Sequence, residues 1–298
     1  MQFSNDYRTK HTEKMKIVQY RLGEELLPGI VTEIGIVGIG ALLNSLNKPF
    51  QCRSLTNDDV AELKSLKDSQ LRLTEGIPES RLKFGPCVSG FSKIICIGLN
   101  YRKHAAETNM EIPKYPIVFN KFNNTLTDFE NDVPLGTEGE HFDYEVELGV
   151  VIGEKCKNVS IDKALSYVLG YCVANDLSCR DLQFKTSQWL LGKSLDHFLP
   201  LGKYLVTADE VGDPQKLELS CFLNGVIRQK SNTSDMIFTV AEIISFLSKH
   251  MTLEPGDLIL TGTPSGVIMG LQDKKWLKPG DLVKVEIEKL GFTENRMV

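Results

Sequence analysis

The chain has 298 residues, 42% of them hydrophobic and 24% charged, with 24 Gly and 12 Pro. This length and composition exclude a small disulfide-stapled scaffold, a collagen-like chain and a disordered chain, and they predict a folded protein of about two domains. The formal net charge is −5 and no block of Lys or Arg is present, so we expect no nucleic-acid partner.

Cysteine usage and hydropathy bear on the compartment. The seven cysteines are odd in number and form no Cys-x-x-Cys pair, which predicts a reducing compartment without a thiolate metal site. The most apolar stretch, 34–43, is shorter than the roughly 20 residues that span a bilayer, so we expect no membrane partner. Residues 1–14 hold no apolar signal core, and we expect a cytoplasmic or mitochondrial protein.

The N-terminal part of the chain predicts a small unit of its own. Residues 15–22 alternate weakly between apolar and polar side chains, as a strand does. Thr56 opens a segment with the acidic first turn and the apolar spacing of a short capped helix. Gly and Pro then crowd residues 76–90, as they do in linkers. We therefore predict a small N-terminal domain with its linker at 1–88 and a larger domain at 89–298.

A glycine cluster at 35–40 is similar to a dinucleotide-binding loop. Gly38 and Gly40 are followed by Leu43 where the third Gly of that pattern belongs, and no βαβ unit surrounds them. We therefore discount the loop. A nicotinamide-dependent oxidoreductase that uses this glycine cluster stays an alternative function, which a titration with the cofactor would test.

The larger domain is rich in predicted strands. Its apolar, β-prone runs are short and bounded by turn residues. Helical spacing of apolar side chains occurs in only two places, at 161–169 and 243–250. Strands in excess over helices predict a β-rich α+β fold and not an alternating doubly wound sheet. The predicted strands lie at 93–99, 144–152, 171–174, 217–223, 258–260 and 282–287.

Two acidic side chains stand two residues apart in the apolar run 143–152. On a strand, alternation places Glu145 and Glu147 on one face with their Cα atoms about 6.6 Å apart. Buried at that distance they need a compensating cation, and no Lys or Arg lies on this strand. Asp176 ends a second apolar run, and three carboxylates indicate a hard cation, Mg²⁺, Mn²⁺ or Ca²⁺ before zinc. The alternative is a solvated face of an edge strand.

Polar and cationic side chains follow Asp176. Ser178 is a candidate N-cap for a helix on which Arg180 and Gln183 stand three residues apart and so share a face. They could reach the pocket of Asp176, although such side chains are more often solvated. Lys193 lies in an apolar, Gly-containing context, where an ammonium is unusual unless it faces carboxylates or a substrate oxyanion.

Two further groups are candidates for acid–base chemistry and anion binding. His104 and Glu107 are three residues apart, a spacing that lets the carboxylate orient the imidazole in a helical turn. The strand at 258–260 runs into a turn of Gly, Pro and hydroxyl side chains, including Thr263, that could hold a small carboxylate. A chance surface pair and an ordinary turn are the respective alternatives.

Taken in order, these motifs resemble the fumarylacetoacetate hydrolase family from about residue 90 to the C-terminus. Each motif is weak alone, but six in the same order are jointly specific. Residues 188–193, 278–281 and 286–288 most closely resemble the branch called fumarylacetoacetate hydrolase domain-containing protein 2. The family motifs lie at 98–101 with His104, 144–148, 175–176 with Arg180 and Gln183, 192–194, 236–238 and 260–264.

The resemblance implies an architecture and a metal site. The larger domain would be a catalytic domain of mixed β-strands rolled around a central metal pocket, usually in a homodimer. At matching positions, Glu145, Glu147 and Asp176 would be the Mg²⁺ ligands. His104 and Glu107 would form the acid–base dyad on a lid that orders when substrate binds.

The resemblance also implies substrate contacts, with one departure. Full-length fumarylacetoacetases have a further metal-binding Asp where this chain has Ile97, which argues against fumarylacetoacetate as the substrate. The positions that hold the substrate's carboxylate or developing oxyanion are matched by Lys193, Arg180, Gln183 and Thr263.

The functional hypothesis is an Mg²⁺-dependent enzyme acting on a small 2-oxo acid through its enolate. Mg²⁺ would polarise the carbonyl, His104 would move a proton at C3, and Lys193 would offset charge on the enolate oxygen. For this branch we expect oxaloacetate enol–keto tautomerisation. The alternatives are acylpyruvate carbon–carbon hydrolysis, oxaloacetate decarboxylation, and a catalytically silent metal-binding partner protein.

Overall fold

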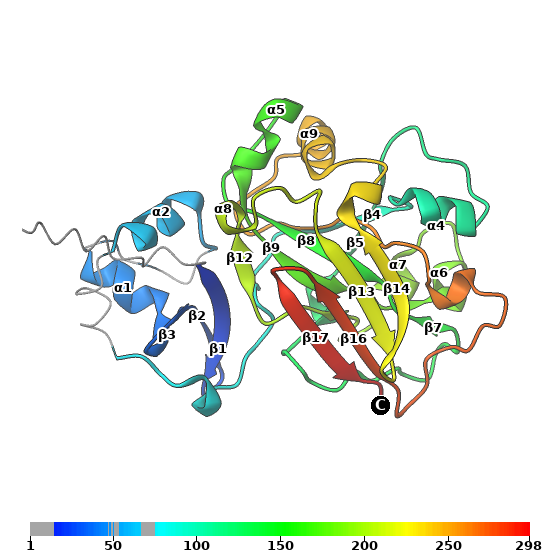
Figure 1. Ribbon diagram of the computed structural model, residues 1–298, viewed down its shortest axis with the longest axis horizontal. Helices are drawn as coiled ribbons and strands as arrows, with labels where there is room; N and C mark the ends of the chain where they lie inside the picture. Colours follow the sequence, from blue (N-terminus) through cyan, green and yellow to red (C-terminus); the bar gives the residue numbers. More distant parts are fainter. Residues whose placement is uncertain (1–14, 47, 49, 51–53, 67–74) are drawn as a thin grey trace, which may run out of the picture.

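The computed structural model describes residues 15–46, 48, 50, 54–66 and 75–298. Figure 1 shows the first three strands and two helices at one end of the molecule, with the remaining strands and helices beside them. Among the described residues, no helix is both long and apolar enough to cross a bilayer. Residues 1–14, in which we expect no apolar signal core, lie outside the described residues, as does Cys52.

The N-terminal strands form an antiparallel meander. β1 (Lys16–Leu22) pairs with β2 (Glu25–Thr32), and β2 pairs with β3 (Gly35–Gly38). Two helices follow, α1 (Ile39–Ser45) and α2 (Asn57–Ser65). β1 confirms the predicted strand, and α2 confirms the predicted helix. Thr56 caps α2 in a capping box, because its side chain accepts the Asp59 N–H and Asp59 accepts the Thr56 N–H.

The glycine cluster at 35–40 has a structural explanation. β3 and β2 are antiparallel, so the strand–helix step from β3 to α1 is not part of a parallel βαβ unit. Gly35 has a φ of +114°, and a Cβ there would lie 2.5 Å from the Ile77 carbonyl oxygen. Glycine is therefore required by the backbone at this position and not by a nucleotide.

The largest sheet has nine strands in the order β3-β2-β1-β12-β9-β8-β15-β4-β5. Its neighbours are antiparallel except β15 and β4, which are parallel. β1 joins the rest through β12, so the N-terminal strands extend this sheet. The division of the chain at residue 88 stays a prediction. The strands are β4 (Ile94–Gly98), β5 (Ile117–Lys121), β8 (Val146–Ile152), β9 (Val168–Asn175), β12 (Leu205–Thr207) and β15 (Leu258–Leu260).

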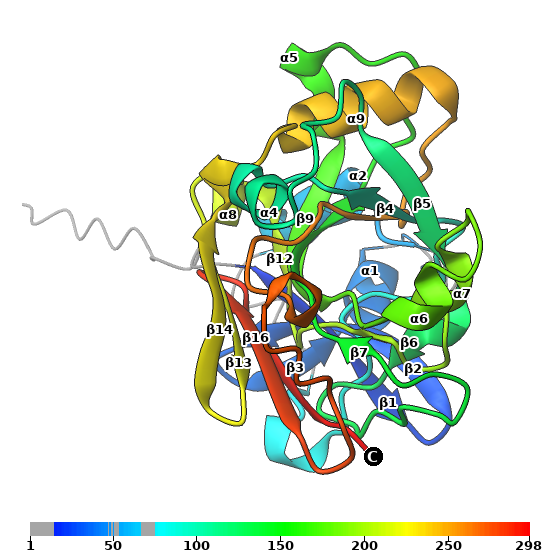
Figure 2. The same cartoon turned by 90° about the vertical axis from the view of Figure 1, so that its right-hand side faces the viewer.

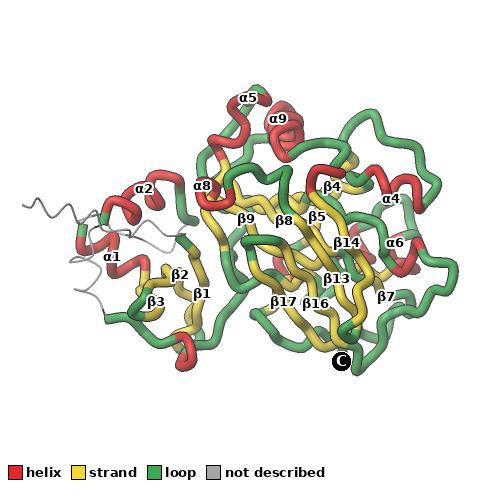
Figure 3. Tube along the Cα trace, in the orientation of Figure 1, coloured by secondary structure: helices red, strands yellow, loops and turns green. Residues whose placement is uncertain are grey.

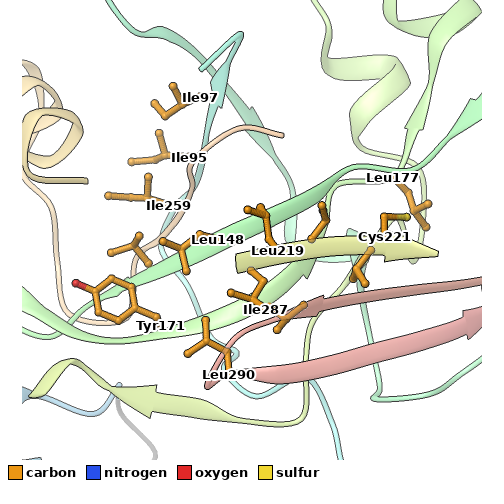
Figure 4. Close-up of a cluster of buried hydrophobic side chains, with 14 of the residues drawn as sticks. Ile95, Ile97, Leu148, Tyr171, Leu177, Leu219, Cys221, Ile259, Ile287 and Leu290 are labelled. Atoms are coloured by element: carbon orange, nitrogen blue, oxygen red, sulfur yellow. The ribbon is translucent and has the colours of Figure 1, made fainter. Parts of the chain in front are cut away.

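A second, four-stranded antiparallel sheet packs against the first. Its order is β14-β13-β16-β17, and the main hydrophobic core lies between the two sheets. Figure 4 shows Leu148 and Tyr171 from the large sheet facing Leu219 and Ile287 from the small one. All four side chains are at most 3% exposed, so this contact excludes water. The strands are β13 (Glu218–Leu223), β14 (Val226–Asn232), β16 (Leu282–Ile287) and β17 (Gly291–Arg296).

The strand-rich α+β fold is confirmed, and its helices lie at the periphery (Figure 3). The longest, α9 (Val240–His250), confirms the helix predicted at 243–250 and begins with a second capping box, between Thr239 and Glu242. α5 (Ile161–Ala164) packs beside it, and α8 (Ala208–Val211) adjoins β12.

One helix prediction is wrong in extent. The helix expected over 161–169 ends at Ala164, and a 3₁₀ turn, Leu165–Tyr167, leads directly into β9. Val168 and Leu169 are buried and belong to the strand. Their apolar spacing fits a helix, but pairing of β9 with β8 and β12 supplies backbone partners and burial that a helix here would lose.

Short elements complete the end of the molecule that carries the candidate site. Figure 2 faces this end and shows α4, β5, α6 and α7 arranged around it. α6 packs on α7, and α7 packs on β5. The short elements are α4 (Arg102–Glu107), α6 (Arg180–Gln183), α7 (Leu190–Lys193), β6 (Leu126–Thr127), β7 (Phe142–Asp143), β10 (Ser178–Cys179) and β11 (Leu199–Pro200), with 3₁₀ turns at Glu79–Arg81, Asn123–Thr125, Thr233–Asp235 and Ile268–Gly270.

Candidate active site

Three acidic side chains from two adjacent strands converge. Glu145 directly precedes β8, Glu147 lies within it, and Asp176 directly follows β9. The antiparallel register brings Asp176 opposite Glu145, whose carbonyl accepts the Asp176 N–H at 2.9 Å. One carboxylate oxygen from each of the three lies within 4.8 Å of the others. All three residues are at most 6% exposed, so the solvated-edge alternative is wrong.

The cations that these acids require come from two short helices. Lys193, at the end of α7, donates from Nζ to Glu145 Oε2 and to Asp176 Oδ2, each at 2.7 Å. Arg180, at the start of α6, donates from Nη2 to Glu145 Oε1 at 2.6 Å. The prediction that the buried acids need a compensating cation is therefore confirmed, and the cations come from α6 and α7 and not from the strand itself.

Two charged residues of this cluster escaped the sequence analysis as site residues. Lys121, at the end of β5, donates from Nζ to Asp176 Oδ1 at 2.6 Å and to the Leu177 carbonyl at 3.1 Å. Asp143, in β7, accepts from Arg180 Nε at 2.9 Å. Both side chains are fully buried. Nothing in the spacing around Lys121 signals a site, because its partner lies 55 residues away.

The described charges of the cluster do not balance. With every acid ionised, the four carboxylates of Asp143, Glu145, Glu147 and Asp176 would face three cationic side chains, which leaves one negative charge in excess. Among the described residues, Glu147 is the member of this group without a cationic partner. Its Oε2 accepts only a backbone N–H, from Gly262 at 2.8 Å. An added divalent cation would relieve this excess.

The pKa values of the two neighbouring glutamates diverge for this reason. Burial opposes ionisation of Glu145, but the charges of Lys193 and Arg180 outweigh it and lower its pKa to about 2. Burial, reinforced by the charges of Asp176 and Glu145, holds the pKa of Glu147 well above its ordinary value. One strand therefore carries a satisfied carboxylate and an unsatisfied one, two residues apart.

A glycine lets the backbone reach Glu147. Gly262 has a φ of +95°, and a Cβ there would lie 2.8 Å from Asn100 Cβ and 2.9 Å from the Ile97 carbonyl oxygen. Asn100 fixes this turn because its Nδ2 donates to the Thr261 carbonyl at 2.8 Å. The turn after β15 is thus built to aim one amide at one carboxylate.

α6 carries the predicted pair, although its N-cap differs from the prediction. Arg180 Nη1 donates to Gln183 Oε1 at 2.9 Å, so the two share a face as expected. Ser178 is not the N-cap, because it lies in β10, paired with β7, and its Oγ donates to the Asp176 carbonyl. Cys179 stands at the cap position, and its Sγ donates to Asp181 Oδ1 and does not cap the helix backbone.

A second glycine sets the position of Lys193. A Cβ on Gly192 would lie 2.3 Å from Gln183 N and 2.4 Å from the Cys179 carbonyl oxygen. Because both are backbone atoms of the neighbouring segment, neither could move aside cheaply. Gly192 therefore permits the contact of α7 with α6 that brings Lys193 to the carboxylates.

The predicted dyad forms on α4. His104 Nδ1 lies 3.1 Å from Glu107 Oε2, and Glu107 Oε1 accepts the Gly266 N–H at 3.0 Å. Glu107 therefore links the short helix to the loop after β15. His104 is 7% exposed and lines the same cavity as Glu145 and Glu147.

Thr263 lies in this cavity, and a residue from the second sheet holds it there. Thr263 Oγ1 donates to the Val146 carbonyl at 3.0 Å and accepts from Gln229 Nε2 at 2.8 Å. The amide of Gln229 is unambiguous, since it accepts from Val146 N–H and donates to the Pro264 carbonyl. Gln229 was not predictable from the sequence, because β14 carries no pattern that points to this loop.

The cavity is small and has two chemically different ends. Its volume is about 70 Å³. His104, Lys193, Arg180, Glu145 and Glu147 define a charged end. The other side is apolar and is formed by Ile97, Leu99, Met110, Phe119, Trp189 and Met269.

The chain is a strand-rich α+β protein whose buried carboxylates could hold a metal ion beside a His–Glu pair. The model of the family described as fumarylacetoacetate (FAA) hydrolase C-terminal matches residues 93–298, and the chain belongs to this family. The family resemblance is confirmed, and the chain is an enzyme of this family.

Known relatives agree with this assignment. The chain is 40% identical over 292 residues to the protein of Rattus norvegicus named oxaloacetate tautomerase Fahd2a, mitochondrial, covering 95% of this chain and 92% of that protein. Fumarylacetoacetate hydrolase from Exiguobacterium antarcticum has a TM-score of 0.78 at 28% identity, covering 95% and 99%. Fumarylpyruvate hydrolase from Pseudomonas aeruginosa, solved with Mn²⁺ and pyruvate, has a TM-score of 0.63 at 29% identity, covering 72% and 91%.

Proposed function

We propose that the chain is an Mg²⁺-dependent oxaloacetate enol–keto tautomerase. The observation that carries the proposal is the charge deficit of the buried cluster, in which Glu147 has no cationic partner among the described residues. The name of the rat relative supports the choice of substrate and reaction. A small cavity with one charged end suits a compact 2-oxo acid.

Glu145, Glu147 and Asp176 are the residues proposed to hold the metal. Carboxylate oxygens suit Mg²⁺, and Mn²⁺ or Ca²⁺ is compatible with the same ligands. The oxygens of Glu145 and Asp176 that bond to Lys193 and Arg180 keep further lone pairs for a cation. When bound, the ion would supply positive charge that polarises the carbonyl of a 2-oxo acid.

Lys193 is proposed to meet the oxygen on C2 of the substrate. Its ammonium has three N–H donors, of which two are bonded to Glu145 and Asp176. The third donor remains for an anionic oxygen in the cavity that Lys193 lines. Burial disfavours the charged ammonium, but the carboxylates of Asp176 and Glu145 outweigh it and raise the pKa of Lys193, so it stays charged. Arg180, Gln183 and Thr263 are proposed to complete the substrate contacts.

His104 is proposed to move the proton at C3. The carboxylate of Glu107 can only accept, so Nδ1 of His104 carries the hydrogen between them. Nε2 is then the ring atom that accepts a proton from C3 or returns one to it. Glu107 also stabilises the charged imidazolium that forms in that step. In the enol-to-keto direction the enol would lose its hydroxyl proton to solvent water, the imidazolium of His104 would give a proton to C3, and the ring would recover a proton from solvent, so no covalent intermediate forms.

The test follows the enol absorbance of oxaloacetate. We expect decay to accelerate with the enzyme and Mg²⁺, and to return to the uncatalysed rate with EDTA. His104→Ala should lower kcat by about 10²-fold or more, because general acid–base catalysis contributes on that scale. The same rate with enzyme, with EDTA and with His104→Ala would overturn the assignment.

A second candidate is acylpyruvate carbon–carbon hydrolysis. The apolar side of the cavity, formed in part by Phe119 and Trp189, would suit an uncharged acyl group better than a second carboxylate. Pyruvate release from acylpyruvates distinguishes this hydrolase from the tautomerase. Pyruvate release from oxaloacetate would instead reveal a decarboxylase.

Assembly and compartment complete the proposal. We place the protein in mitochondria, the compartment in the rat relative's name, with the cytoplasm as the alternative. A homodimer is proposed from the family resemblance, and exposed apolar side chains at Val118 and Phe122 offer it a surface. Light scattering with size exclusion measures the mass, and microscopy of the tagged full chain measures the location.

A further inference from the structure

An aromatic pair forms the apolar wall of the cavity. The rings of Phe119 and Trp189 meet edge to face, with centroids 5.2 Å apart and planes at 66°. The indole also lies against the backbone of β4, because a Cβ on Gly98 would be only 2.6 Å from Trp189 Cζ3. Such contacts leave the indole little room to rotate away.

This wall is tied to the charged end of the cavity. Trp189, the N-cap residue of α7, has helical backbone angles and lies four residues before Lys193, so the two side chains project from the same side of the turn. Lys193 Nζ lies 5.2 Å from the centroid of the Phe119 ring while it bonds to Glu145 and Asp176. The aromatic pair therefore lies directly beside the ammonium proposed to bind the substrate.

The small size of the cavity makes the aromatic wall important for which ligands fit. A cavity of about 70 Å³ leaves little enclosed space beyond that taken by a compact acid. Trp189 is the largest of the apolar side chains that line it. Removing the indole would therefore enlarge the apolar side without touching any carboxylate of the cluster.

We infer that Trp189, supported by Phe119 and Gly98, sets the longest substituent that a 2-oxo acid can carry in this site. The inference rests on the proposed 2-oxo acid substrate, and it assigns the specificity of that site to one residue. Lys193 and the carboxylates fix the polar head of the ligand. The indole then stops the chain that extends from it.

The experiment measures binding, so it does not depend on which reaction the enzyme catalyses. With Mn²⁺ present, calorimetry gives the Kd of oxalate and of pyruvate, 2-oxobutyrate, 2-oxopentanoate and 2-oxohexanoate. In the wild type we expect affinity to fall once the chain exceeds the cavity. In Trp189→Ala each added methylene should instead tighten binding by up to about fourfold, so the 2-oxohexanoate-to-pyruvate Kd ratio drops at least about tenfold.

Matched variants separate size from folding. Leu191→Ala removes an apolar side chain from the same helix that is 55% exposed and does not line the cavity, so its length profile should equal the wild type. Trp189→Phe should shift the profile less than Trp189→Ala and serves if the alanine variant does not fold. Oxalate, which has no chain, should bind all folded variants alike.

The possible failures are distinguishable. An unchanged length profile in Trp189→Ala and Trp189→Phe, with oxalate still bound, would overturn the role of Trp189 and leave the proposed function intact. A wild type that binds neither oxalate nor any 2-oxo acid with Mn²⁺ would overturn the proposed function and this inference with it.

Discussion

Glu145 and Glu147 stand two residues apart and occupy opposite electrostatic settings. Glu145 is bonded to Lys193 and Arg180, whereas within the described part of the chain Glu147 accepts a hydrogen bond from the Gly262 amide alone. Neutralising the side chain should therefore change the stability of the fold in opposite directions at the two positions. The same contrast explains why a metal would bind here, since only the second carboxylate lacks compensation.

The matched variants Glu145→Gln and Glu147→Gln test this contrast in metal-free protein. Glu145→Gln should destabilise the fold by about 3 kcal/mol, because Lys193 and Arg180 each lose one of their two carboxylate partners while staying buried. Glu147→Gln should raise the unfolding temperature, since the amide oxygen still accepts from Gly262 while the repulsion is gone. Differential scanning calorimetry with EDTA measures both, and destabilisation of equal size in the two variants would contradict the charge count.

Glu107 is predicted to act through His104. Glu107→Gln keeps an acceptor for the Gly266 amide but loses the charge that stabilises the imidazolium. We expect kcat to fall by about 10²-fold, with Mn²⁺ affinity unchanged. A steady-state assay paired with a Mn²⁺ titration measures this, and a loss of metal affinity equal to the loss of rate would show that the residue only holds the fold.

Among single residues, the sequence predicts those that follow from a pattern of neighbouring residues. Glu145 and Glu147 follow from strand alternation, and Asp176 from the end of an apolar run. Lys121 and Gln229 could not be predicted, because each meets its partner across a distance in the chain that no spacing rule covers.

The short helices of the site depend on how closely they pack. α7 reaches α6 only because Gly192 has no side chain, and this contact places Lys193. A helix of one turn has no stability of its own, so its position is set entirely by such contacts.

Gly192→Ala is predicted to displace α7. The new Cβ would meet backbone at 2.3 Å, so we expect a loss of about 3 kcal/mol in stability and of most metal-dependent activity. Gly40→Ala is the control, because in α1 a Cβ would meet nothing nearer than 3.9 Å and should be neutral or stabilising by about 1 kcal/mol. Chemical denaturation measures both, and a Gly192→Ala protein as stable as the wild type would contradict the packing argument.

Elements were predictable where local signals agree with tertiary pairing. The capped helix after Thr56 and the strands β4, β8, β13, β15 and β16 follow their patterns. The segment 161–169 does not, because β9 recruits Val168 and Leu169 against their helical spacing. Ser178 fails as a cap for the same reason, since β10 pairs with β7 before α6 begins.

Across the whole molecule, the N-terminal strands cover an edge of the catalytic sheet. β1 pairs with β12, and Ile17, Ile30 and Val37 pack into a core that also contains Val151 and Leu205. We propose that the boundary at residue 88 separates this cover from a unit that holds every candidate site residue.

The fragment 89–298 is therefore predicted to keep the chemistry and lose stability. It would retain all the proposed metal and substrate contacts, but it would expose the β12 edge and the apolar surface beneath β1. We expect a loss of at least about 5 kcal/mol, because several buried aliphatic side chains lose their cover. Calorimetry and the enol assay on this fragment measure both. A fragment as stable as the full chain would show that the N-terminal strands contribute little.

The sequence predicts the class of the fold better than its topology. Short β-prone runs with few helices indicate a β-rich α+β protein, which is confirmed. The order of the nine strands was not accessible, because neighbours such as β15 and β8 are far apart in the chain and neither carries a mark of its partner.

The most direct test of the account is anomalous diffraction from crystals grown with Mn²⁺ and oxalate. We predict one strong Mn²⁺ peak among the carboxylates of Glu145, Glu147 and Asp176, with oxalate beside Lys193. A peak elsewhere, or none at a Mn²⁺ concentration that supports turnover, would contradict it.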